Sequence, residues 1–235
     1  RPDGAELLPA AAALADGAEL VGVLTHAGDS YECKTTAEIE AAAEAERAGI
    51  VLAAERLRAA GHTVKIVSAG STPTLMFAKD ETGVTEMRAG VCALFDLFMS
   101  NVGACTVDDI AGSVLATVIG RQVDKRRVIL DCGFLALSRD RGTARQAHDY
   151  GYGLVCGLDG KPLADGTIVL TGTNQEHGIL TLPENSPLTQ EDFPIGRRLR
   201  ILPNHACPTA APYGSLVLIE NGRVAEVLDH VRGWD

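Results

Sequence analysis

An imidazole and a thiol stand two positions apart in the segment Pro203–Pro208, whose sequence is Pro-Asn-His-Ala-Cys-Pro. In an extended chain, side chains at positions i and i+2 lie on the same face, so His205 and Cys207 are placed to bind one ion. A ring nitrogen and a thiolate suit Zn²⁺ better than Mg²⁺. Two protein ligands leave positions open for water or substrate, as a catalytic metal requires. The alternative is a histidine and a cysteine that are neighbours at a strand end and share no ion.

Two glycine-containing loops offer donors for an anion. The segment 70–72, Gly-Ser-Thr, follows an expected strand that ends near Ser68, and it opens an expected helix. The first N–H groups of a helix have no acceptor within it, and with the two hydroxyls they are suited to a phosphate group. The segment 88–91, Arg-Ala-Gly-Val, follows the next expected strand and adds further N–H donors. Two ordinary capped turns would give the same pattern.

A third loop, with Tyr31 at its end, follows the apolar run Leu-Val-Gly-Val-Leu at 20–24. In parallel α/β folds, active sites form at the carboxyl ends of the strands, which is where this loop would lie. A tyrosine there is placed to donate a hydrogen bond to a cofactor oxygen. Packing of Tyr31 against the rim of the fold is the alternative.

The first hundred residues alternate between helix-like and strand-like patterns, which indicates parallel strands, as in a βα-barrel or a doubly wound sheet. Thr35 or Thr36 is suited to cap a long helix with Glu38 in its first turn, and Gly61 is suited to end it. Only about three strands are visible, whereas a barrel has eight, so a barrel would be incomplete. The expected helices are 6–14, 35–60 and 72–78, and the expected strands are 20–24, 64–67 and 85–88.

After about residue 110, short β-rich runs are separated by Gly, Pro and Asp, which predicts an all-β domain. Asn221-Gly222 is the strongest hairpin signal, because this dipeptide suits a type I′ turn. We therefore predict two domains, 1–110 and 111–235. The expected strands of the second are 113–119, 127–130, 167–171, 178–182, 198–202 and 216–219.

The bulk composition excludes several classes of protein. The net charge of −10 argues against nucleic acid or an anionic membrane as the main partner. No apolar run approaches the roughly 18 residues that a membrane-spanning helix needs. The six cysteines form no CxxC pair and no disulfide framework, so we expect a reducing cytoplasm.

Seven stretches together resemble bacterial D-serine dehydratase-like proteins, in which they occur in the same order. They are THAGDSY, VSAGSTPT, TEMRAGV, LDCGFLALSRDRGT, GYGLV, NQEHGIL and PNHACPT, and the resemblance covers nearly the whole chain. Each stretch alone is unspecific, but the set is specific. The family belongs to the fold-type III pyridoxal-phosphate enzymes, which include alanine racemase and metal-dependent D-threonine aldolase.

The resemblance implies an α/β part, which is the second half of an alanine-racemase-like βα (TIM-type) barrel, followed by a C-terminal β-domain. It implies pyridoxal 5′-phosphate and Zn²⁺ as cofactors, with His205 and Cys207 as the zinc ligands. Arg88 matches the arginine that faces the pyridine nitrogen in the alanine racemase branch. The cofactor-binding residues that it implies are Tyr31, Ser68, Gly70, Ser71, Thr72, Arg88, Gly90 and Val91.

The implied reaction is β-elimination of water from a D-3-hydroxy amino acid, D-serine giving pyruvate and ammonia. Aldol cleavage of the D-threonine aldolase type and a 3-hydroxy-D-aspartate substrate are alternatives, and the thiol of Cys207 favours the dehydratase. None of the five lysines matches the family's Schiff-base lysine, so we expect the chain to need an N-terminal segment of the same enzyme. We also expect a homodimer. A non-enzymatic fragment that only binds cofactor or metal is the remaining alternative.

Overall fold

The structure is a computed structural model that describes residues 1–14 and 17–231. The chain divides into two compact units, which are described separately. The first comprises residues 1–92 and 102–104, and the second comprises residues 93–101 and 105–235. The domain boundary that we placed at residue 110 stays a prediction.

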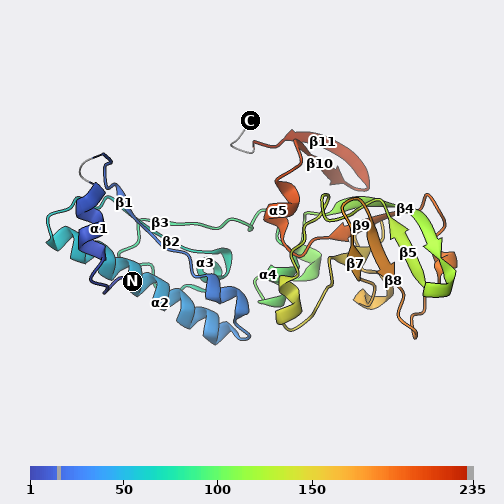
Figure 1. Cartoon of the computed structure of the whole chain (residues 1–235), viewed down its shortest axis with the longest axis horizontal. Helices are drawn as coiled ribbons and strands as arrows, with labels where there is room; N and C mark the ends of the chain where they lie inside the picture. Colours follow the sequence, from blue (N-terminus) through green and yellow to red (C-terminus); the bar gives the residue numbers. More distant parts are fainter. Residues whose placement is uncertain (15–16, 232–235) are drawn as a thin grey trace. The chain divides into compact units, whose positions relative to one another are not determined.

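A three-stranded parallel sheet forms the centre of the first unit (Figure 1). Its strands lie in the order β1 (Gly22–Leu24), β2 (Ile66–Ala69) and β3 (Glu86–Met87). Because the strands run parallel, as the alternating sequence pattern predicts, their carboxyl ends share one edge. All three loops with candidate cofactor residues leave from that edge.

The long helix α2 (Thr36–Ala59) packs on the sheet and on α3 (Thr72–Phe77). It begins with the capping box that the sequence predicts, in which the Thr35 hydroxyl accepts the N–H of Glu38 and the Glu38 carboxylate accepts the N–H of Thr35. It ends before Gly61, whose φ of +91° suits glycine. With α1 (Leu7–Ala13), the helix covers a core of Ala11, Ile50, Ala54, Leu57, Val64, Val67 and Ala69.

The second unit contains a six-stranded antiparallel sheet in the order β6-β9-β4-β5-β8-β7. Alternate residues of its strands are fully buried, which is the pattern of a sheet with one face in the core. Phe193 is the largest fully buried side chain among the described residues. The strands are β4 (Val114–Gln122), β5 (Arg127–Leu130), β6 (Leu154–Cys156), β7 (Gly172–Thr173), β8 (Gly178–Thr181) and β9 (Arg198–Leu202).

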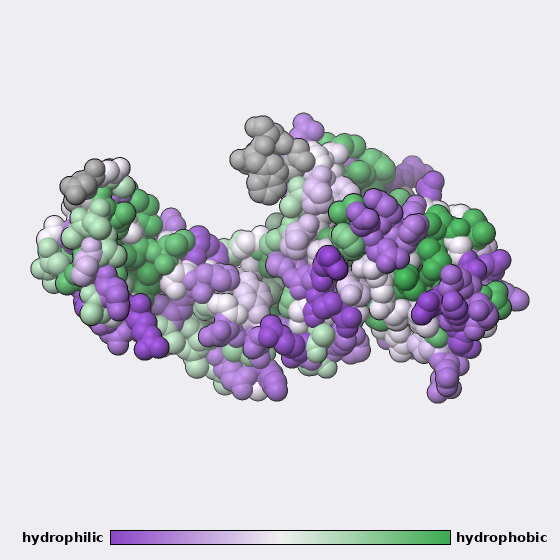
Figure 2. Space-filling model, in the orientation of Figure 1, coloured by the Kyte–Doolittle hydropathy of each residue, from purple (hydrophilic) through white to green (hydrophobic). Residues whose placement is uncertain are grey.

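The hairpin of β10 (Ser215–Glu220) and β11 (Arg223–Asp229) confirms the Asn-Gly turn signal. Asn221 and Gly222 have φ of +51° and +73°, as a type I′ turn requires. The hairpin exposes a set of apolar side chains, which appear as a green patch in Figure 2. They are Val217, Leu218, Ile219, Val224, Val227 and Leu228.

The predicted strand 167–171 is wrong. Only isolated bridges form there, Gly151 with Leu170 and Leu154 with Val169, because the segment finds no partner with which to form a continuous ladder. The short helices α4 (Leu97–Asn101) and α5 (Ala206–Ala210) and strand β6 had no clear sequence pattern. The 3₁₀ segments are Gly28–Glu32, Val107–Asp109, Val123–Lys125, Gly142–Arg145, Leu163–Gly166 and Gln190–Asp192.

Within the described residues, the structure contains no helix that is both long and apolar enough to cross a bilayer.

Candidate cofactor and metal sites

Gly70 brings two of the candidate cofactor loops together. It ends β2 with a φ of +112°, and a Cβ atom at this position would lie 2.9 Å from the backbone N and O of Arg88 at the end of β3. Only glycine combines that backbone conformation with so close an approach. The close packing of these two strand ends therefore requires glycine at position 70.

Buried hydroxyl groups follow Gly70. Ser71 and Thr74 form a capping box at the start of α3, with their side-chain oxygens 3.1 Å apart. The Ser71 hydroxyl also lies 3.2 Å from the Ser30 hydroxyl in the loop after β1. The loops after β1 and β2 are thus joined by a row of hydroxyl groups at the carboxyl edge of the sheet.

The buried carboxylate of Glu46, on helix α2, forms hydrogen bonds with the loops after β1 and β2. One of its oxygens accepts the N–H groups of Ala27 and Gly70 at 3.0 and 3.1 Å, and the other accepts the Thr74 hydroxyl at 2.9 Å. The N–H of Gly70, which the sequence suggested as a phosphate donor, therefore donates within the protein. Sequence patterns gave no reason to single out Glu46 within its alanine-rich helix.

Arg88 joins the ends of β1 and β2. Its guanidinium donates to the Ser68 hydroxyl at 2.6 Å and to the Thr25 carbonyl oxygen. The Ser68 hydroxyl in turn donates to Glu86 at 2.6 Å. The structure brings the predicted residues Ser68 and Arg88 together on this edge.

The remaining predicted cofactor residues lie on the same three loops. The N–H of Val91 donates to the Thr72 hydroxyl at 3.2 Å, which links the third loop to the second. Gly90 lies beside this contact, and a Cβ atom there would meet nothing within 4 Å. Tyr31 is half-buried, with its ring centroid 5.9 Å from that of His26, whose Nδ1 lies 3.2 Å from the Gly70 oxygen.

These features fit the phosphate group of pyridoxal phosphate. The N–H of Thr72 lies in the first turn of α3, where it has no intrahelical acceptor, and the hydroxyls of Ser71 and Thr72 belong to the same turn. A Cβ atom at Gly90 would meet nothing within 4 Å, so the backbone of the third loop is open to an added group there. The residues present are therefore suited to hold the cofactor at this edge.

The candidate metal ligands lie in the second unit, after strand β9. His205 is extended, with φ and ψ of −138° and +108°, but Ala206 begins the short helix α5. The expectation that both ligands project from one extended segment is therefore wrong. The turn into the helix replaces the strand geometry, and the Cys207 thiol still lies close enough to His205 to be the largest cause that raises the pKa of the imidazole.

Acidic groups surround His205. The pKa of its imidazole is raised to about 9, first by the hydrogen bond with Cys207 and then by the bond to Asp140, while burial opposes the shift. The Nδ1 atom of His205 lies 2.9 Å from Oδ2 of Asp140. The ring of Phe98 packs edge-on at a centroid distance of 5.6 Å.

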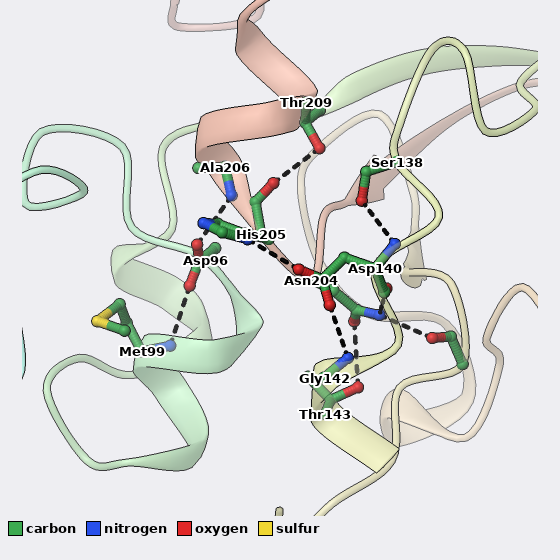
Figure 3. A network of polar contacts seen from close by, with 11 residues as sticks. Asp96, Met99, Ser138, Asp140, Gly142, Thr143, Asn204, His205, Ala206 and Thr209 are labelled. Carbon is green, nitrogen blue, oxygen red and sulfur yellow. Dashed lines mark hydrogen bonds and ion pairs between the residues drawn. The ribbon is translucent and has the colours of Figure 1, made fainter. Parts of the chain in front are cut away.

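The backbone on either side of His205 is also anchored (Figure 3). The buried amide of Asn204 donates to the carbonyl oxygens of Asp140 and Gly151 at 3.0 and 2.7 Å. Asp96, which is 1% exposed, accepts the N–H of Ala206 at 2.8 Å. Burial raises the pKa of Asp96, and the N–H groups that it accepts act in the opposite direction.

The donor set of this site fits a borderline-soft divalent cation. The imidazole of His205 and the thiol of Cys207, at the start of α5, supply nitrogen and sulfur ligands of the kind that Zn²⁺ prefers. Within residues 1–14 and 17–231, no group of three or more His, Cys, Asp or Glu side chains is arranged to hold a metal ion. A metal at this pair would thus have two protein ligands and positions open for water or substrate.

Comparison with known proteins identifies the class. Residues 1–97 match the model of the alanine racemase N-terminal domain, and residues 111–219 match the model named "Putative serine dehydratase domain". The fold is therefore that of the alanine-racemase-like pyridoxal-phosphate enzymes, with a barrel part followed by a β-domain.

The similar proteins narrow this class. The chain is 52% identical to D-threo-3-hydroxyaspartate dehydratase of Delftia sp. over 93% of its length and 57% of that enzyme. It is 30% identical to D-serine dehydratase of Dictyostelium discoideum over 85% of its length and 51% of that enzyme. The solved structure of the Delftia enzyme superposes with a TM-score of 0.88, covering 100% of this chain and 62% of that one. The chain belongs to the D-serine dehydratase-like family of fold-type III pyridoxal-phosphate enzymes, and it spans somewhat more than half the length of these relatives.

Proposed function

We propose that the protein carrying this chain is a lyase that uses pyridoxal phosphate and zinc to eliminate water from a D-3-hydroxy amino acid. The observation that carries the proposal is the placement of His205 and Cys207 at the start of α5, with Asp140 hydrogen-bonded to the histidine. A nitrogen–sulfur pair with open positions suits a metal that binds a substrate hydroxyl. The alternative is a protein that binds the cofactor or metal without catalysing a reaction, and product analysis distinguishes the two.

The first unit would supply the cofactor site. Ser71, Thr72 and the segment 90–91 would hold the phosphate, and Tyr31 and Arg88 would contact the cofactor from the loops after β1 and β3. Bound pyridoxal phosphate supplies an electron sink for the charge that develops when a proton leaves the amino acid's α-carbon. The hydrogen bonds of Arg88 to Ser68 and Thr25 keep its guanidinium in place at the strand ends.

The second unit would supply the metal site. A bound metal supplies Lewis-acid assistance to the departing hydroxyl, worth several kcal/mol. His205 and Cys207 would hold it. Solved variants of a D-threo-3-hydroxyaspartate dehydratase change to alanine a histidine and, two positions further on, a cysteine, and the cysteine variant is described as being in the metal-free form. The same spacing separates His205 from Cys207 in this chain.

Among substrates, D-threo-3-hydroxyaspartate ranks first and D-serine second, because the chain is 52% identical to a dehydratase of the former and 30% identical to one of the latter. Aldol cleavage is the competing reaction, since a D-threonine aldolase of Arthrobacter is also similar, at 26% identity. We further propose that the protein acts as a homodimer in the cytoplasm.

Product analysis tests the proposal. The protein, loaded with pyridoxal phosphate and zinc, is incubated with D-threo-3-hydroxyaspartate and separately with D-serine. Elimination yields ammonia with oxaloacetate or pyruvate, whereas cleavage of hydroxyaspartate yields glycine and glyoxylate. Cys207→Ala is expected to abolish keto acid formation, and Cys92→Ala, which changes another exposed thiol, serves as the control. Formation of glycine without ammonia would show that the protein is an aldolase and not a dehydratase. The absence of product from either substrate would favour the non-enzymatic alternative.

A further inference from the structure

Asp140 has a defined partner for each of its polar groups. Its Oδ1 accepts the N–H of Gly142 at 2.8 Å, and its Oδ2 lies 2.9 Å from Nδ1 of His205. Its own N–H donates to the Ser138 hydroxyl at 3.0 Å, and its carbonyl oxygen accepts from Asn204. With both ends of the residue held, the carboxylate has one orientation toward the imidazole (Figure 3).

This contact fixes the roles of the two ring nitrogens. An ionised carboxylate accepts hydrogen bonds and donates none, so Nδ1 of His205 must be the protonated nitrogen. The lone pair of the neutral ring is then on Nε2, the nitrogen on the far side from Asp140. A carboxylate on the second nitrogen of a ligating histidine fixes the ring and makes the ligand more basic.

The ring is also fixed through the backbone. Asn204 anchors the residue before it, Asp96 accepts the N–H of the residue after it, and the Thr209 hydroxyl donates to the carbonyl oxygen of His205 at 2.9 Å. Three consecutive residues thus have hydrogen bonds to side chains that hold their backbone or, for Asn204, their side chain in place. The remaining freedom is rotation of the imidazole, against which Phe98 packs and for which Asp140 provides the hydrogen bond that selects one orientation.

We infer that Asp140 is a positioning residue that selects Nε2 of His205 as the metal-binding nitrogen and thereby sets the affinity of the site for a borderline-soft divalent cation. The inference rests on the proposed function in one respect, namely that His205 and Cys207 bind the metal. It adds Asp140, which lies 65 positions from His205 in the sequence and would act on the metal through the imidazole.

The chain offers a matched control at Asp149. Asp149 also accepts, with Oδ1, the N–H of the glycine two residues on, here Gly151 at 2.9 Å. Its Oδ2 pairs with Arg141 at 2.8 Å instead of with a histidine. Asp140→Asn and Asp149→Asn therefore change the same kind of turn, and only the first alters the acceptor on His205.

The experiment measures binding of Co²⁺ alone by the absorption of its thiolate bond, and of Zn²⁺ by competition with a chelator. Asp140→Asn and Asp140→Ala are expected to weaken binding about 10- to 100-fold, whereas Asp149→Asn stays within about twofold of wild type. Asp140 variants that bind zinc as tightly as wild type would overturn the inference. Wild-type protein without the cobalt–thiolate band would instead contradict the proposed metal site itself.

A second measurement does not depend on how well the variants fold. In zinc-loaded wild-type protein, NMR of isotope-labelled histidine is expected to show a proton on Nδ1 of His205 and the metal on Nε2. Zinc on Nδ1 would overturn the inference, whatever the variants do.

Discussion

The substitution Asp96→Asn tests whether the Asp96 carboxylate anchors the start of helix α5, which carries Cys207. Oδ1 of Asp96 accepts the N–H of Met99 at 3.0 Å, and Oδ2 accepts that of Ala206 at 2.8 Å. Asparagine offers one acceptor oxygen, so one buried N–H loses its partner whichever way the amide is turned. That loss costs about 1–3 kcal/mol, and removing a buried charge recovers part of it, so we expect a net loss of about 1–2 kcal/mol.

Urea denaturation of wild type and variant measures this difference in unfolding free energy. The control is Asp109→Asn, whose carboxylate also accepts two bonds, from the N–H and the hydroxyl of Thr106, but lies exposed. Water can replace a lost partner there, so a much smaller change in unfolding free energy than that of Asp96→Asn is expected. Equal stability of Asp96→Asn and wild type would refute the role of Asp96 as the acceptor that anchors α5. The variant is also expected to bind zinc more weakly, because Ala206 lies between the two proposed ligands.

Three further outcomes follow from the geometry. Zinc is expected to protect Cys207 from alkylation but not Cys92, which is also exposed, as mass spectrometry of the labelled peptides would show; equal protection of both would contradict the site. Gly70→Ala is expected to cost at least about 1–3 kcal/mol in unfolding free energy, because its Cβ would meet the backbone of the third strand; Gly61→Ala, with similar φ and open space, should cost less. The apparent zinc affinity is expected to fall by at least about tenfold per pH unit below about 9, because zinc must displace the proton held by His205 and any proton held by the Cys207 thiol; affinity independent of pH between 7 and 8.5 would contradict this.

Elements with local signals were predictable from the sequence. The capping box at Thr35 and Glu38, the stop at Gly61 and the turn at Asn221-Gly222 each act within a few residues, and the structure has all of them. Strand 167–171 failed because its β-branched run pairs only through isolated bridges. Pairing partners elsewhere in the chain decide whether such a run becomes a strand.

The surroundings of the candidate site could not be predicted in the same way. The contact between Asp140 and His205 joins residues 65 positions apart, and that between Asp96 and Ala206 joins residues 110 positions apart. Asp140 belongs to one of the stretches that resemble the family, but nothing near it in the sequence indicates a histidine partner. The spacing in the sequence identified His205 and Cys207 as a pair, whereas the residues that orient them were visible only in the tertiary structure.

The zinc content of the protein is the most direct measure of whether His205 and Cys207 bind a metal ion. Wild-type protein and the double variant His205→Ala/Cys207→Ala are dialysed against the same zinc buffer, and the bound zinc is measured by elemental analysis. We predict about one zinc ion per chain in the wild type and none above background in the double variant, with both proteins folded. Equal zinc content in the two proteins would contradict this prediction.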